Sequence, residues 1–261
     1  TGALTMAGRI PLIQRLTWQS SVLIMASHAV HQAERLATRD DRPLVFNAWF
    51  PFDTAASPVF EFIYVSQTVT ALWFTVSLTS FIGLYAMLVA VGCTQLQKLS
   101  AALLGACVER GLRDRVLQHQ HILRFLRELQ DTYRLVLVGP FLLIACGMCV
   151  NTFSILLSWG NATDTLQALT LIVALTSQLY VYCWFGNELT GQSAELREAV
   201  WGCSWVGAPL REQRALLFMM GSANEFTLTA GGIIPASRHT LMQVLNQTYS
   251  FLMFLMNFMD D

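Results

Sequence analysis

Long stretches of this chain carry almost no charge, and they alternate with stretches that are rich in arginine. Four of them are strong candidates for membrane spans, at about 59–93, 135–159, 164–187 and 239–259, and a weaker one covers 14–32. Roughly 20 helical residues cross the ~30 Å hydrocarbon core of a bilayer. The pattern therefore predicts an all-α, polytopic membrane helix bundle with about five spans in a single transmembrane domain, residues 1–261.

The distribution of arginine and lysine orients these predicted spans. Basic residues gather in the segments 94–134 and 188–238, whereas the short loop after residue 159 has none. The positive-inside rule then places both basic segments in the cytoplasm, the N-terminal side in the cytoplasm and the C-terminus outside. Apolar residues recur at helical spacing through 96–133, so the segment 94–134 is predicted to be helical. The segment 188–238 is predicted to add a second cytoplasmic helical segment.

A polar stripe runs along the last predicted span. Its members follow each other at steps of four, seven and four residues: Asn246, Ser250, Asn257 and Asp261. Such steps keep them on one face of a helix, where Phe254 and Phe258 interrupt or flank them. A polar line broken by apolar rings suits a water-filled pore with a dewetting gate. The same polar atoms would also serve as hydrogen-bonding groups between packed helices, so the pattern by itself leaves both interpretations open.

The composition supports a membrane protein and argues against other classes. Apolar residues make up 54% of the chain and charged residues 13%, whereas soluble domains carry about a quarter charged residues. A net charge of −1 gives no sign of nucleic-acid binding. Phosphate-loop, zinc-protease and nucleophile-elbow motifs are missing from the sequence, so we expect no enzyme, no cofactor and no metal site. We expect no disulfide either, because the six cysteines fall in predicted spans or cytoplasmic segments.

Two groups of residues resemble insect odorant receptors. The first resembles the C-terminal signature of that family: Tyr182–Leu189, Trp205, 227–232, Pro235 and 248–250. The second, 48–53 with Ser57-Pro58, resembles the family's second extracellular loop. The resemblance runs from about residue 40 to the end of the chain. The Thr-Ala-Gly-Gly stretch at 229–232 is similar to an odour-tuning subunit rather than to the shared coreceptor.

This resemblance implies a fold and a function. The family fold is a seven-helix bundle with a cytoplasmic N-terminus and an extracellular C-terminus, so about five spans suggest an N-terminally incomplete chain. The implied function is an odorant-specific subunit of a ligand-gated, non-selective cation channel in the plasma membrane. It would form a hetero-oligomer, a tetramer, with the coreceptor and would bind a small volatile ligand in an intramembrane pocket. The last helix would line the pore.

The resemblance also nominates site residues. Phe254, Asn257 and Phe258 fall where the family has its pore and gate. Candidate ligand-contacting residues are Met25, His28, Phe60, Tyr64, Thr68, Leu169 and Thr170. Aromatic rings with few polar groups suit small volatile ligands, which bind mainly by apolar burial and shape. Packing between helices is the alternative role for each of these ligand candidates.

Two other classes of membrane protein remain as alternatives. The first is a gustatory-type or G-protein-coupled chemoreceptor, and a G-protein-coupled receptor would place the C-terminus in the cytoplasm. The second is a small-solute transporter, which would carry internal repeats and charged groups at midplane depth. We find neither feature in the sequence.

Overall fold

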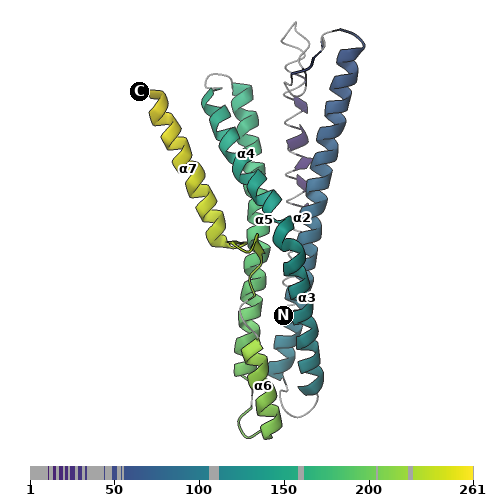
Figure 1. Cartoon of the computed structure of the whole chain (residues 1–261), viewed down its shortest axis with the longest axis vertical. Coiled ribbons are helices and arrows are strands. Elements are labelled where there is room, and N and C mark those ends of the chain that lie inside the picture. The colour runs from purple at the N-terminus through teal and green to yellow at the C-terminus, as the bar shows by residue number, and fades with distance from the viewer. Residues whose placement is uncertain are drawn as a thin grey trace. The chain divides into compact units, whose positions relative to one another are not determined.

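The structure is a computed structural model that is almost entirely helical (Figure 1). It describes residues 59–105, 112–157, 162–203, 205–222 and 226–260, with scattered residues between 11 and 58. The helices are α2 (Val59–Gly105), α3 (Leu112–Val136), α4 (Val138–Leu157), α5 (Ala162–Trp201), α6 (Leu210–Ser222) and α7 (Arg238–Asp260). The described residues between 11 and 33 are also helical. An antiparallel hairpin of β1 (Thr229–Ala230) and β2 (Ile234–Pro235) precedes α7. The predicted all-α class is confirmed.

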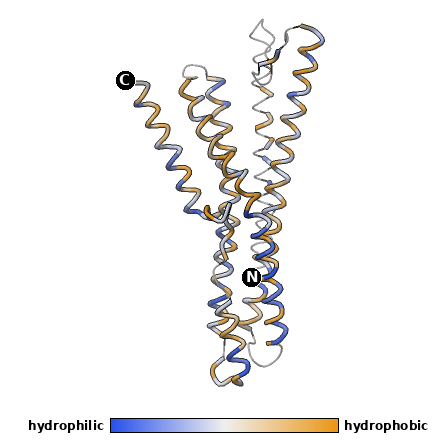
Figure 2. Tube along the Cα trace, viewed as in Figure 1, coloured by the Kyte–Doolittle hydropathy of each residue, from blue (hydrophilic) through white to orange (hydrophobic). Residues whose placement is uncertain are grey.

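Three helices of the described chain are long and apolar enough to cross a membrane. They are Val59–Leu104, Val138–Leu157 and Asp164–Trp201, which overlap the spans predicted at 59–93, 135–159 and 164–187. Figure 2 shows α4 largely hydrophobic, whereas α3 mixes hydrophilic and hydrophobic positions along its length. Helix α7 does not join the three, because its Gln and Asn residues lower its mean hydropathy. The span at 239–259 stays a prediction.

The chain divides into two compact units, and four long helices contribute to both. The first unit comprises residues 1–14, 84–145 and 179–247, and the second comprises 15–83, 146–178 and 248–261. Helices α2, α4, α5 and α7 each have one part in either unit, so the units are not successive domains of the sequence. Both segments that the charge pattern assigns to the cytoplasm, 94–134 and 188–238, belong to the first unit.

An aromatic cluster joins four helices in the core of the first unit. Tyr85 of α2 lies 5.4 Å from Tyr133 of α3 and 5.2 Å from Tyr182 of α5, measured between ring centroids. Phe141 of α4 lies 5.9 Å from Tyr182. The Tyr85 hydroxyl donates a hydrogen bond of 3.1 Å to the Tyr182 carbonyl, so the buried phenol has a partner.

Helix α3 is amphipathic, as its apolar spacing predicts. Leu112, Ile122, Leu126 and Leu129 are buried. Of the arginines between them, Arg113, Arg124 and Arg127 are exposed and Arg115 is half-buried. Leu126 also packs against α2, because a Cβ atom at Gly92 would lie 3.1 Å from a methyl group of Leu126. The absence of a side chain at Gly92 therefore allows α2 to pack closely against α3.

One expectation about the cysteines is wrong. Cys203 is disulfide-bonded, although its place in a predicted cytoplasmic segment led us to expect a free thiol. Cys93, Cys146, Cys149 and Cys183 are free. The expectation relied on the cellular compartment of each cysteine, which does not determine which two cysteines lie next to each other in the fold.

Candidate functional site: an apolar cavity and the terminal helix

A cavity of about 260 Å³ lies within the second unit. Its wall comes from α2, from α5 and from helical residues of the N-terminal stretch: Ser21, Ile24, Met25, Ala71, Phe74, Thr75, Leu78, Thr79, Gln167, Leu171, Ala174, Leu175 and Gln178. Aliphatic and aromatic side chains dominate this wall, and none of the described lining residues is charged. Such a cavity can hold a small and mainly apolar molecule.

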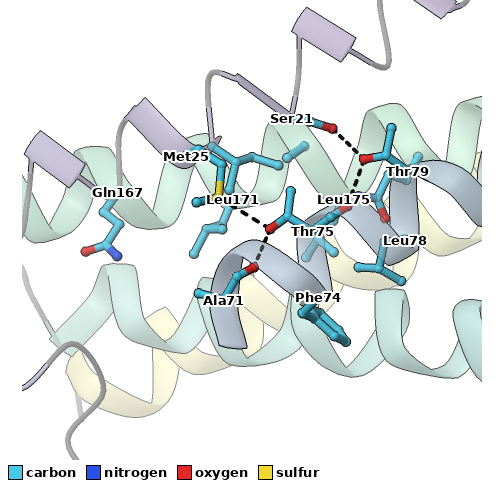
Figure 3. Close-up of a pocket in the computed structure, with 13 residues that line it drawn as sticks. Ser21, Met25, Ala71, Phe74, Thr75, Leu78, Thr79, Gln167, Leu171 and Leu175 are labelled. Atoms are coloured by element: carbon cyan, nitrogen blue, oxygen red, sulfur yellow. Dashed lines mark hydrogen bonds between the residues drawn. The ribbon is translucent and has the colours of Figure 1, made fainter. Parts of the chain in front are cut away.

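Hydroxyl groups form a short polar strip on one side of the cavity (Figure 3). The Thr75 hydroxyl lies 2.9 Å from the Ala71 carbonyl and 3.4 Å from the Met25 sulfur. The Thr79 hydroxyl lies 2.9 Å from the Thr75 carbonyl and 2.8 Å from the Ser21 hydroxyl. These bonds join α2 to the N-terminal stretch, so the polar strip also holds the cavity wall together.

The spacing of residues on α2 and α5 explains how two helices build one wall. Ala71, Phe74, Thr75, Leu78 and Thr79 recur every three or four residues, which places them on one face of α2. The lining residues of α5 follow the same spacing from 167 to 178. Leu175 is in turn supported by α4, because a Cβ atom at Gly147 would lie 3.0 Å from its methyl group.

The cavity includes one of the ligand-contacting residues that the sequence nominated. Met25 lines it, and His28 lies outside the described residues. Leu169, which is 47% exposed, and Thr170, whose hydroxyl bonds to the Leu166 carbonyl at 2.8 Å, do not line it. Both residues lie on α5 between Gln167 and Leu171, which do line the cavity.

The three candidates on α2 lie nearer its N-terminal end than the cavity does. The Phe60 and Tyr64 rings pack with centroids 5.9 Å apart, and the Thr68 hydroxyl donates to the Tyr64 carbonyl at 2.8 Å. All three are half-buried, and none lines the cavity. The three residues do share one face of α2, but the part of α2 that lines the cavity begins at Ala71.

Sequence reasoning missed most of the cavity for an identifiable reason. The signal was present, since small, apolar and hydroxyl residues recur at helical spacing in 71–79 and in 167–178. The same spacing describes any helix face that packs against a neighbour. Only the neighbouring helices show which face borders an open volume.

The start of α7 is defined by local hydrogen bonds. The Ser237 hydroxyl accepts a hydrogen bond from the Thr240 amide at 3.3 Å, as an N-cap residue does. The Thr240 hydroxyl donates to the Pro235 carbonyl at 2.6 Å. Gly231 and Gly232 make the preceding turn with φ of 66° and 78°, a region that glycine adopts without strain.

The β1–β2 hairpin, residues 229–235, is attached to two helices of the first unit. Gln130 of α3 accepts a bond from the Thr229 amide at 3.1 Å and donates one to the Thr229 hydroxyl at 2.6 Å. The Arg134 carbonyl accepts a bond from the Gly231 amide at 2.6 Å. On the other side, Gly186 of α5 lies so close to Ala236 that a Cβ atom would be 2.3 Å from its carbonyl oxygen.

The predicted pore residues lie on an exposed face of α7. Phe254 is 65% exposed and Phe258 is 75% exposed, and Asn257 beside them is also exposed. Asn246 and Ser250 of the same stripe are exposed as well. The opposite face is half-buried, and there the Thr248 hydroxyl lies 3.9 Å from the Met148 sulfur of α4. The exposed face is therefore available to line a pore or to contact another subunit.

Comparisons with known proteins agree on one family. A family model described as 7tm Odorant receptor matches residues 11–249. Odorant receptor 19a of Drosophila melanogaster is 23% identical over 231 residues, which cover 84% of this chain and 60% of that protein. Odorant receptor 10 of Aedes albopictus is 21% identical and covers 80% of this chain and 59% of that protein. This chain thus spans about three fifths of the length of these relatives.

A solved structure has the same fold. It is that of the insect olfactory receptor OR5 from Machilis hrabei in complex with eugenol, with a TM-score of 0.84 and 17% sequence identity. The alignment covers 97% of this chain and 67% of that one. This similarity supports a membrane helix bundle of the same architecture.

Proposed function

Because this chain belongs to the 7tm odorant receptor family, we propose that it is an odorant-specific subunit of a ligand-gated, non-selective cation channel. It is a multi-pass membrane protein, as its three long apolar helices and its family indicate. We place it in the plasma membrane, with the N-terminal side in the cytoplasm and the C-terminus outside, from the charge pattern. Its partner is the insect odorant coreceptor, in a hetero-oligomer.

The observation that carries this proposal is the uncharged cavity in the second unit. At about 260 Å³ it lies near the lower end of the volumes typical of small-molecule sites, roughly 300–1,000 Å³. An apolar cavity of roughly 150 Å³ is enough to bind benzene. A volatile compound of one ring with a short substituent therefore fits. The solved structure of similar fold was itself a complex with a small organic molecule, eugenol.

The pore is assigned to α7. Its exposed stripe combines amide and hydroxyl groups with the Phe254 and Phe258 rings. In an oligomer, these rings would form an apolar constriction that excludes water when the channel is closed. The hairpin that holds the start of α7 to α3 and α5 provides a route by which movements of those helices reach the pore.

The first experiment is a current measurement. The receptor is expressed in cultured cells with and without the coreceptor, and whole-cell current is recorded while a panel of volatiles is applied. We expect an odour-evoked cation current that requires the coreceptor. Silence of a receptor that reaches the cell surface, across a broad panel of apolar volatiles, would argue against the channel and favour a test of solute uptake.

A second experiment tests the pore assignment through Phe258. Replacing this ring by alanine removes apolar bulk from the proposed constriction, so we expect Phe258→Ala to raise the resting current. Met256→Ala is the control, because Met256 is also exposed but lies on nearly the opposite side of the helix. Unchanged resting current, selectivity and conductance in Phe258→Ala and Asn257→Ala would contradict the assignment of α7 to the pore.

A further inference from the structure

The hydroxyl protons of Thr75 and Thr79 in the cavity wall are already engaged within the protein. Thr75 has a single hydroxyl proton, and both atoms near it, the Ala71 carbonyl oxygen and the Met25 sulfur, are acceptors. Thr75 therefore donates inside the protein whichever partner it takes. A bound molecule can therefore interact only with a lone pair on the Thr75 hydroxyl oxygen.

Thr79 is engaged in the same way. Its proton points either to the Thr75 carbonyl at 2.9 Å or to the Ser21 oxygen at 2.8 Å. In the first case, Ser21 donates to Thr79, and in the second case Thr79 donates to Ser21. In both arrangements the proton that joins these two hydroxyls stays within the protein, so Thr79 also meets a ligand as an acceptor.

The two glutamines of the wall do not cancel this preference for a ligand that donates a hydrogen bond. Gln167 and Gln178 have amides that both donate and accept, so they do not favour one kind of ligand over the other. Gln167 also lies away from Thr75 and Thr79 in the close-up (Figure 3). Apart from Ser21, whose hydroxyl pairs with that of Thr79, the other lining residues in the described part of the chain are apolar. The hydroxyl strip is therefore the part of the cavity that can discriminate between ligand donors and acceptors.

We propose that this cavity prefers small aromatic or aliphatic alcohols and phenols, whose hydroxyl donates to Thr75 Oγ1, over carbonyl compounds of the same size. This inference rests on the proposed odorant-binding role of the cavity and specifies its ligand class. A carbonyl ligand would place its oxygen lone pairs against those of Thr75. Alternatively, Thr75 would turn its proton away from the Ala71 carbonyl, which loses one neutral hydrogen bond.

Three probes of the same number of non-hydrogen atoms separate these cases. Benzyl alcohol can donate, benzaldehyde can only accept, and ethylbenzene does neither. Each is titrated against the purified protein in detergent while the unfolding temperature is recorded, because a ligand that binds the folded state raises it whether or not a channel opens. We expect benzyl alcohol to bind roughly fivefold more tightly than benzaldehyde, since one neutral hydrogen bond distinguishes them.

Variants at position 75 assign the preference to one oxygen atom. Thr75→Val keeps the shape of the side chain but removes the oxygen, so the preference for benzyl alcohol over benzaldehyde should disappear. Thr75→Ser keeps the oxygen and should keep the preference. The matched control is Thr70→Val, because the exposed Thr70 hydroxyl makes the same kind of bond, to the Ser66 carbonyl at 2.8 Å, but does not line the cavity.

Three results would overturn the proposal. They are equal binding of the alcohol and the aldehyde, a preference that survives in Thr75→Val, and no binding of any probe at millimolar concentration. None of these decides whether the receptor is a channel, which the current recordings test separately. Conversely, an alcohol preference that depends on Thr75 would stand even if no current were found.

Discussion

At the scale of single residues, Gly186 is the position where α5 and the segment before α7 come closest. A Cβ atom there would lie 2.3 Å from the Ala236 carbonyl oxygen and 2.7 Å from its Cβ atom. Because the nearest atom belongs to the backbone, it cannot turn aside as a flexible side chain would. We expect Gly186→Ala to lower the free energy of unfolding by about 1–3 kcal/mol, measured by thermal or denaturant unfolding in detergent.

Gly191 is the control for this substitution. It lies on the same helix, but nothing is within 4 Å of where its Cβ atom would be. Alanine has a higher helix propensity than glycine, so Gly191→Ala should leave stability unchanged or raise it by up to about 1 kcal/mol. Equal effects of the two substitutions would show that propensity, and not the contact with Ala236, determines the result.

His119 is a second residue whose surroundings give a prediction. Its side chain is 1% exposed on α3, its Nε2 atom has no hydrogen-bond partner within the described chain, and burial lowers its pKa. The unfolded chain therefore binds a proton at this site more readily than the folded one as the pH falls below about 6.5, the ordinary pKa of histidine. Acidification through that range should destabilise the fold.

The measurement is the unfolding temperature at pH 5.5 and 7.5. We expect His119→Leu to reduce the difference between the two values, because leucine fills a similar volume and does not titrate. His121→Leu also removes an imidazole from α3, but an exposed one, and should keep the wild-type difference. If His119→Leu retains the full difference, the acid sensitivity arises elsewhere.

At the scale of elements, the hairpin of residues 229–235 depends on one side chain of α3. Gln130 accepts from the Thr229 amide and donates to its hydroxyl. Replacing Gln130 by leucine leaves the part-buried Thr229 amide without this acceptor, which costs about 1–3 kcal/mol. We expect Gln130→Leu to speed hydrogen exchange at Thr229, as read by mass spectrometry. Gln120→Leu, an exposed position on the same helix, should not.

Element boundaries differ from the sequence pattern where a local irregularity interrupts an apolar run. The predicted span at 135–159 begins within the last turn of α3, which ends at Val136, and α4 starts at Val138. Pro140 in the first turn of α4 has no amide proton to donate, so it is tolerated there but not deeper in a helix. An apolar run does not show such a break, because hydrophobicity is continuous across it.

At the scale of the whole molecule, the membrane topology is the property to test. The charge pattern predicts a cytoplasmic N-terminal side and an extracellular C-terminus. A tag at the C-terminus should therefore bind antibody on intact cells, and a tag at the N-terminus should bind only after permeabilisation. The reverse result would fit a G-protein-coupled receptor and would contradict the proposed topology.

Periodicity and charge alone were sufficient to predict the all-α class of this protein and its three long apolar helices. The uncharged runs at 59–93, 135–159 and 164–187 predict the long helices α2, α4 and α5. The stripe of Asn246, Ser250 and Asn257 can also be read from the sequence, because a face of one helix depends only on local spacing.

Contacts between helices could not be read in the same way. The bonds from Ser21 to Thr79, from Met25 to Thr75 and from Gln130 to Thr229 join residues 58, 50 and 99 positions apart. Each depends on how far one helix is shifted along another, which local periodicity does not encode. For this reason the sequence placed ligand candidates at Phe60 and Tyr64, whereas the packing of α2 against its neighbours opens the cavity from Ala71 to Thr79.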